Sequence, residues 1–506
     1  MAAGTMTVLA ASADDIDTSD QLTMAAAFQK VFVANGANLK VADFINTKLT
    51  ITSLTTAPTR GAIVTQLTSG ATMIVDSVNT AKTIIYGYTT SGTFVTTGGY
   101  TLSGGSMDPT TRVPSAVAQA STTPHWYDWT VYPGGAAGAM PAKAYLIAVY
   151  RGRLVLSGNP QYPNQWFMSK VADPFNWLYG ADDPMSAVAG NNADAGQCPD
   201  IVRALVSFHD DYLIFGCAST IWILRGDPVA GGSLDNLSDT TGMFGANSWC
   251  FDDNRNLYFW GSGGLYEVKS DFSGIRNLTE MVLPDVINDE AADPTTHRIT
   301  MGYDKKRHGI VVAITVLATG VNSNYFYSFK TQGFYPESYP AACGPYSLLY
   351  YDANDTAYAD LLVGCKDGYI RKYLNTAKND DVGATDTAIS SYVTYPITPL
   401  SGQDENGKLA ELVFDLGGGA AAGDAGDTDG VTYELHKGDD AETVLEDIVD
   451  GATAWSSGVL AGTGRKNKIR PRMRGAYMGL KLYNSTASET WAVNRVLYST
   501  QKAGSV

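Results

Sequence analysis

A short pattern that returns five times constrains this 506-residue chain more than any other feature. Each copy has an aromatic residue, a polar turn that is often acidic, and then an apolar strand. The aromatic residues stand at positions 150, 208, 251, 303 and 351, which are 43 to 58 residues apart. This spacing is typical of a four-stranded propeller blade. A third strand follows in four of the copies, at 220–224, 264–268, 325–329 and 368–373.

Strand, turn, strand, short loop and strand make an antiparallel meander, and a closed ring of meanders leaves no long exposed edge. The chain is also rich in Gly, Tyr, Thr and Ser, which suits strands joined by tight turns. We therefore predict an all-β protein built on a β-propeller, with a stacked sandwich as the alternative.

An earlier copy of the pattern is split. Residues 30–36 and 38–44 read as a hairpin around Asn35-Gly36, and the strand that matches them is 126–132. Counting this copy, the propeller has about six blades. The intervening segment 47–110 is nearly uncharged and full of alternating strands, which predicts a small β-barrel inserted in the first blade.

Outside the repeats, the sequence predicts further strands in the C-terminal part, two short helices and a division into five segments. Segments 475–483 and 491–498 alternate as strands of a half-buried antiparallel sheet. Short helices are expected only at 20–28 and 439–449. The predicted segments are 1–46 (N-terminal segment and start of the propeller), 47–110 (inserted module), 111–374 (propeller), 375–389 (linker) and 390–506 (C-terminal antiparallel β domain).

The net charge and the cysteine content restrict the classes of function that are expected of the chain. The net charge of −16 repels phosphate backbones, which disfavours sequence-reading nucleic-acid binding but suits a conduit through which DNA slides. The five Cys residues are widely spaced and include no CxxC pair, so buried reduced thiols are expected rather than a metal site or a disulfide frame. The start of the chain lacks a basic region, and no run of 18 apolar residues occurs, so neither a signal peptide nor a membrane span is expected.

No catalytic, cofactor or metal motif is recognisable, and we expect no enzyme. The five His residues lie in weak contexts, and no HExxH, GxSxG or P-loop pattern is present. Three Asp pairs fall at turns, where Asp bonds its own backbone; glycoside hydrolysis or metal binding is the alternative. A loose calcium-like loop lacks its Glu, so disorder is expected there. These carboxylates are Asp182-Asp183, Asp210-Asp211, Asp252-Asp253, and Asp424, Asp427 and Asp429.

One basic cluster interrupts the acidic chain. If its segment is a single strand, the alternation places five of its cations on one face. The face is either solvated and balanced by the acidic segment 439–450, or a contact surface for an acidic neighbouring subunit or for DNA. The cluster consists of Arg465, Lys466, Lys468, Arg470, Arg472 and Arg474.

An aromatic stretch at 159–177 contains Trp166 and Trp177. Such rings either form a platform that contacts sugars or partner proteins, or cap the core of a blade.

Three phrases in and just before this stretch carry a family resemblance. Arg153–Gly158, Asn164–Ser169 and Asp173–Trp177 resemble a sequence common in phage structural proteins, and the chain looks like the tail nozzle proteins (tail tubular protein B) of short-tailed bacteriophages. The segment from Arg472 to Val496 is similar to their C-terminal β domain. The inserted module matches no pattern of the family.

The resemblance implies a virion protein of the tail or neck that assembles in the host cytoplasm. It implies a ring, usually a hexamer, below the portal and adaptor, which conducts and retains DNA and contacts adaptor, tail fibre or spike proteins. It implies no cofactor. A receptor- or glycan-binding tail protein and a propeller glycoside hydrolase are the alternatives.

Overall fold

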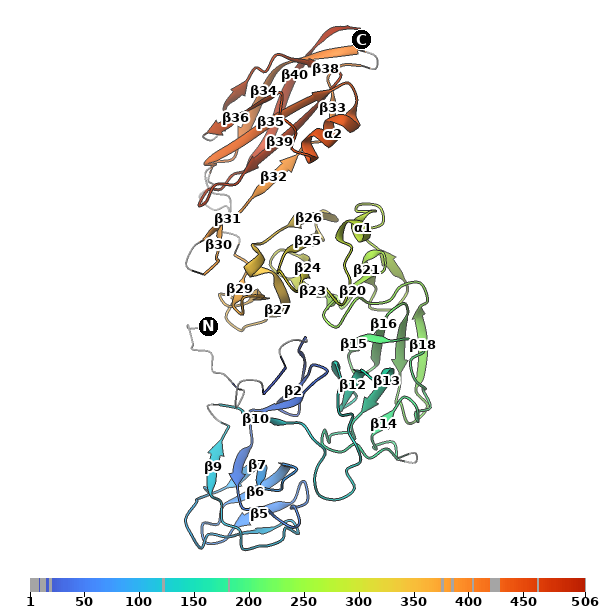
Figure 1. The fold of residues 1–506 in the computed structure, drawn as a ribbon, viewed down its shortest axis with the longest axis vertical. Coiled ribbons are helices and arrows are strands. Elements are labelled where there is room, and N and C mark those ends of the chain that lie inside the picture. The colour runs from blue at the N-terminus through green and yellow to red at the C-terminus, as the bar shows by residue number, and fades with distance from the viewer. Residues whose placement is uncertain are drawn as a thin grey trace. The chain divides into compact units, whose positions relative to one another are not determined.

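The computed structural model describes residues 9, 15–17, 21–120, 123–180, 183–374, 377–383, 386–402, 405–418, 428–461 and 464–505. Strands dominate them, which confirms the all-β class (Figure 1). The chain divides into two compact units. The first consists of 1–318, 323–337 and 346–361, and the second of 319–322, 338–345 and 362–506.

Five successive four-stranded sheets make up most of the first unit, and in each sheet the strands lie in chain order. The first contains β1 (Thr23–Ala27), β2 (Lys30–Ala34), β3 (Leu39–Asp43) and, after a long insertion, β10 (His125–Asp128). The second contains β11 (Leu146–Tyr150), β12 (Arg153–Asn159), β13 (Tyr162–Met168) and β14 (Val188–Ala189), and the third β15 (Val202–Phe208), β16 (Tyr212–Cys217), β17 (Ile221–Arg225) and β18 (Ser233–Ser238). The fourth contains β19 (Trp249–Phe251), β20 (Leu257–Gly261), β21 (Gly264–Val268) and β22 (Ile275–Asn277), and the fifth β23 (His297–Asp304), β24 (Gly309–Val316), β25 (Asn322–Ser328) and β26 (Gly333–Glu337).

A further sheet is three-stranded, with β27 (Pro345–Tyr351), β28 (Asp360–Cys365) and β29 (Ile370–Lys372) in that order, and the division between the two units falls within it. The described residues contain only two α-helices, α1 (Val286–Glu290) and α2 (Ala441–Val449), and one 3-10 turn, η1 (Ala341–Cys343).

The repeated sequence pattern corresponds to the first hairpin of each meander. The marker aromatic ends the first strand or lies next to its end, as where Phe208 pairs with Tyr212 and Tyr303 with Ile310. The turns that follow adopt left-handed backbone angles, with φ of 55° at His209 and 53° at His308. The predicted meander repeat is confirmed.

The split first copy is also confirmed. The β2–β3 hairpin turns at Asn35, whose side-chain oxygen accepts from the backbone N–H groups of Ala37 and Asn38. The turn needs Gly36, because its φ is +84° and a Cβ there would lie 2.2 Å from the Tyr145 ring. After the insertion, β10 pairs antiparallel with β3.

The insertion between β3 and β10 is one six-stranded sheet, seen in Figure 1 as the group from blue to cyan. Its strands are β4 (Thr47–Thr50), β5 (Ile63–Gln66), β6 (Thr72–Val78), β7 (Ile84–Ser91), β8 (Leu102–Gly104) and β9 (Ala116–Gln119). They lie in the open order β8-β5-β6-β7-β4-β9, and no pairing within the described residues joins the two ends into a barrel.

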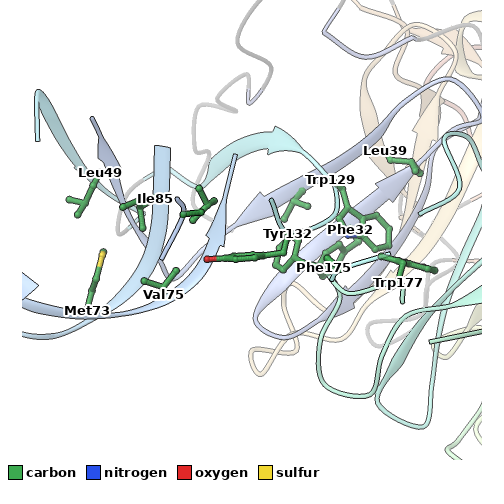
Figure 2. Packing of buried hydrophobic residues seen from close by; sticks show 14 of the residues in the cluster. Phe32, Leu39, Leu49, Met73, Val75, Ile85, Trp129, Tyr132, Phe175 and Trp177 are labelled. Atoms are coloured by element: carbon green, nitrogen blue, oxygen red, sulfur yellow. The ribbon is translucent and has the colours of Figure 1, made fainter. Parts of the chain in front are cut away.

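One continuous core joins this module to the first two sheets. Met73 and Ile85 of the module belong to the same buried cluster as Phe32, Trp129 and Trp177. Figure 2 shows Tyr132 between the two groups of side chains. Burial of these large apolar groups stabilises the packing of the module against the sheet.

The second unit contains a sandwich of two antiparallel sheets. One has the order β32-β39-β35-β36, with β33 also paired to β39; in the other, β37, β38 and β40 all pair with β34. Leu412 and Phe414 of one sheet and Leu435 and Leu480 of the other belong to a single buried cluster. The strands are β32 (Ser391–Thr394), β33 (Thr398–Pro399), β34 (Glu405–Leu416), β35 (Gly430–Gly438), β36 (Ser456–Ala461), β37 (Gly464–Ile469), β38 (Met473–Gly475), β39 (Tyr477–Asn484) and β40 (Val493–Ser505).

Two local expectations differ from the structure. The helix expected at 20–28 is wrong, because β1 occupies Thr23–Ala27 and pairs along its whole length with β2. Within this strand Ala25 is buried in the core cluster that contains Phe32. The expected linker 375–389 contains a two-stranded pairing of β30 (Asn379–Asp380) with β31 (Thr387–Ala388). The helix expected at 439–449 is confirmed as α2, with Asp440 as its N-cap.

Candidate binding surfaces

A network of charged groups joins the first sheet to the inserted module. The Asp76 carboxylate of β6 lies 2.6 Å from the Lys30 ammonium of β2 and 2.9 Å from the Arg60 guanidinium. Asn46 donates to both Asp43 and Asp76. Burial raises the pKa of Asp76, but Lys30 and Arg60 outweigh that effect and hold the pKa below its ordinary value. Because every charge in this network has a partner, the network helps to hold the module in place.

A cavity of about 500 Å³, away from this network, lies where the first strands of several sheets begin. We call it the strand-start pocket. The starts of β1, β11, β15 and β23 contribute to it, together with the loop before β19. Its lining includes Gln21, Tyr145, Asn159, Arg203, His297 and Arg298.

A β-bulge positions Arg203 in this pocket. Val202 pairs with Cys217 and Ala204 with Gly216, so Arg203 is the extra residue between two paired and buried neighbours. A bulge turns such a side chain away from the regular alternation of its strand. Hydrogen bonds from Thr295 hold the pKa of the Asp293 carboxylate below its ordinary value, and the Arg203 charge helps to lower it further.

His297 and Arg298 supply two more nitrogen-rich groups. The Asp293 backbone N–H donates to His297 Nδ1 at 3.2 Å, which leaves Nε2 of the neutral ring as its N–H donor. The Arg298 guanidinium carbon lies 4.7 Å from the Tyr346 ring centroid. The pocket therefore offers donors suited to a negatively charged group.

The predicted basic cluster is not one strand. It divides between β37 and β38, and between them Arg472 adopts a φ of +51°. Ile469 and Met473 face the core of the sandwich, so their neighbours Lys468 and Arg474 lie on the outer face. The side chains of Arg465 and Lys466 lie outside the described residues.

Four cations of the cluster are exposed: Lys468, Arg470, Arg472 and Arg474. Lys468 and Arg470 share the Glu411 carboxylate, at 2.6 and 3.2 Å. The expected balance with segment 439–450 is absent from the described residues, where no ion pair links the two segments. We call these four residues the basic face.

An acidic surface covers the opposite side of the same sandwich. Helix α2 packs on the outer face of the other sheet, where Gly479 allows close approach: a Cβ there would lie 2.5 Å from Ile448 Cδ1. Exposed Leu445 and Val449 also lie on this helix. The carboxylates of α2 and its flanks are Asp439, Asp440, Glu442, Glu446, Asp447 and Asp450, and we call them the acidic face.

Of the two alternatives for the aromatic stretch, the structure supports a place in the core for both tryptophans. Trp166 and Trp177 are fully buried. Trp166 Nε1 donates to the Gly196 carbonyl at 3.1 Å, and Trp177 Nε1 to the Pro174 carbonyl at 3.0 Å. The rings fill cores of the first unit and present no surface to a partner. Sequence alone left both alternatives open, because the burial of these rings depends on residues distant in the chain.

The Asp pairs that the structure describes are turn residues. Asp252 accepts from the backbone N–H groups of Asn254 and Asn256, and Asp183 accepts from Met185 N–H. Asp182, Asp424 and Asp427 lie outside the described residues.

The five cysteines are buried free thiols, as expected. Burial raises the pKa of Cys250. In the part of the chain that the structure describes, no three His, Cys, Asp or Glu side chains gather as a metal site. No described helix is both long and apolar enough to cross a membrane.

No family model matches the chain, and no curated protein does. Among solved structures, similar folds include the extracellular domain of a one-component system from B. thetaiotaomicron (11% identity, TM-score 0.29, 72% of this chain and 44% of that one). Others are an oligogalacturonate lyase from Vibrio parahaemolyticus (10%, TM-score 0.26, 66% and 89%) and an exo-β-1,3-galactanase from Phanerochaete chrysosporium (10%, TM-score 0.19, 90% and 100%). TM-scores this low carry no inference about activity or ligand.

Proposed function

We propose that this chain is a structural, non-enzymatic subunit of a bacteriophage tail, similar to a tail nozzle, which assembles with copies of itself into a ring. The observation that carries the proposal is the sandwich of the second unit, which holds its basic face and its acidic face on opposite sides. A surface of one sign on one side and its complement on the other supports head-to-tail association. Such an interface closes into a ring when the rotation between copies allows it.

The first unit suits a rigid wall in such an assembly. We interpret its five four-stranded sheets and the three-stranded sheet as the six blades of a propeller. The first strands of successive sheets support this, since β1 lies beside β11, β11 beside β15, and β19 beside β23. The net charge of −16 suits a wall along which DNA slides without binding. The short phrases shared with tail nozzle proteins support the same role.

Charge reversal tests the assembly. One variant changes Glu442, Glu446 and Asp450 to Lys, and a second changes Arg470, Arg472 and Arg474 to Glu. We expect the wild-type chain to form rings in electron micrographs and sedimentation velocity, and each variant to remain monomeric, because like charges then meet at the interface.

The decisive experiment is to mix the two variants. Each retains one natural face and carries one reversed face, so the mixture restores both complementary contacts and rings return. A monomeric wild-type chain contradicts the ring. Rings that form in both single variants contradict these two faces as the interface.

A glycan-binding tail protein is the second candidate. The specific observation that favours it is the strand-start pocket, with its three nitrogen-rich side chains. Trp166 and Trp177 do not support the glycan-binding candidate, because both rings are buried.

A further inference from the structure

We propose that the strand-start pocket binds a sugar acid, with its carboxylate held by Arg203 and Arg298. This site does not depend on the ring assembly, because every residue in it belongs to the first unit of a single chain. Its volume of about 500 Å³ lies in the range of cavities that hold small organic ligands.

The charge of the pocket points to an anionic ligand. The chain carries 51 acidic and 35 basic residues, yet two Arg and one His line this cavity. Arg203 reaches it from a bulge, an irregularity that proteins use to redirect side chains beside binding sites. A guanidinium presents N–H groups in a planar fork that matches the two oxygens of a carboxylate.

Two carboxylates close to the pocket, Asp200 and Asp293, have hydrogen-bond partners of their own. Asp200 is engaged by the backbone and hydroxyl of Ser219 and by its neighbour Ile201. Asp293 accepts from the Thr295 backbone N–H at 2.7 Å, and the hydrogen bonds from Thr295, followed by His297 and the charge of Arg203, hold the pKa of Asp293 below its ordinary value. Because Asp293 is exposed to water, its repulsion of a bound anion is screened.

The remaining lining suits hydroxyl groups and a ring. The Gln21 Nε2 atom is buried and has no hydrogen-bond acceptor among the described residues, so a ligand oxygen would satisfy it. His297 Nε2 is a second donor, and Asn159 adds a carboxamide. The Tyr145 ring is 40% exposed and offers a flat apolar surface for one face of a sugar. Phosphate alone would leave most of this cavity unfilled, and so we infer a larger anion.

Calorimetric titration of the full chain with D-galacturonate tests the proposal, with D-galactose and inorganic phosphate as the comparison ligands. We expect galacturonate to bind at least about tenfold more tightly than galactose, because only the acid pairs with the guanidinium groups. Phosphate should bind more weakly than galacturonate. Equal affinity for acid and neutral sugar, or tighter binding of phosphate, would overturn the proposal.

Variants locate the site. Arg203→Gln and Arg298→Gln should each weaken galacturonate binding about tenfold or more, while galactose binding is unchanged. Arg276→Gln is the matched control, because it removes the same charge from the exposed outer strand β22, outside the pocket lining. Thermal unfolding midpoints within the range of the control show that a variant is folded. A folded Arg203→Gln chain that binds galacturonate as the wild type does would contradict the site.

Discussion

Two ion-pair groups in this molecule each consist of one carboxylate, one Lys and one Arg, but they have different roles. In the first unit, Asp76 lies between Lys30 and Arg60; in the second, Glu411 lies between Lys468 and Arg470. The Lys30 side chain is 4% exposed, whereas Lys468 is 44% and Arg470 is 69% exposed. Burial of the cations is therefore the difference between a network that holds two sheets together and one that faces water.

The comparison teaches where each charge matters. An unpaired charge inside the protein has a large desolvation penalty, so its partner cannot be removed without loss of stability. An exposed pair exchanges its partner for water at little cost, and its cations stay available to another molecule. The buried group is suited to structure and the exposed group to association.

The largest difference is expected when each carboxylate is removed. Asp76→Ala leaves Lys30 with Asp43 at 3.9 Å and Arg60 with Asp173 at 3.3 Å, and should lower the free energy of unfolding by about 2 kcal/mol because the shortest ion pairs are lost. Glu411→Ala is the matched control and should leave that free energy nearly unchanged. Urea denaturation followed by tryptophan fluorescence measures both. Equal losses would show that burial does not separate the two groups.

The second-largest effect is expected at low pH, where protonation of Asp76 should lower the stability of the folded chain. The pKa of Asp76 lies below its ordinary value of 3.8 in the folded chain, so its contribution to stability is complete above that pH. The contribution is lost as the pH falls through the folded-state pKa, because protonation then removes the ion pairs. The wild-type chain should lose stability below about pH 4 more steeply than Asp76→Ala. Parallel acid profiles of the two chains would contradict this role.

The smallest effect concerns the exposed group and appears in assembly rather than in stability. Glu411→Ala removes a carboxylate that competes for Lys468 and Arg470, so the basic face becomes more positive. Under the proposed head-to-tail contact, rings should form at lower protein concentration and with a steeper dependence on salt. Sedimentation velocity at several ionic strengths measures both. Weaker assembly of this variant would contradict the basic face as a contact surface.

The sequence predicted the meanders well because their signal is local. A turn that follows an aromatic residue, as at Phe208 and Tyr303, specifies a hairpin whatever packs around it. The capped helix at Ala441–Val449 was predictable for the same reason. The segment 20–28 was misread because a short apolar run has no period that separates helix from strand, and its pairing with β2 decided the outcome.

The candidate sites were less predictable. Trp166 and Trp177 were recognisable as important rings, but their burial depends on residues far away in the chain. The strand-start pocket gives no sequence signal, since Gln21, Arg203 and Arg298 lie in three separate sheets or the segments before them. Only the β-bulge distinguishes Arg203 from an ordinary strand residue, and a bulge can be recognised only when the pairing of both strands is known.

The sequence by itself determined the all-β class, the repeated hairpins, the inserted module and the positions of the charged clusters, because these depend on neighbouring residues and on composition. The tertiary structure alone decided which charges are buried, which tryptophans are core, and that the basic and acidic faces lie on opposite sides of one sandwich. Those properties depend on contacts between residues distant in the chain, and such contacts are set by packing rather than by any local pattern.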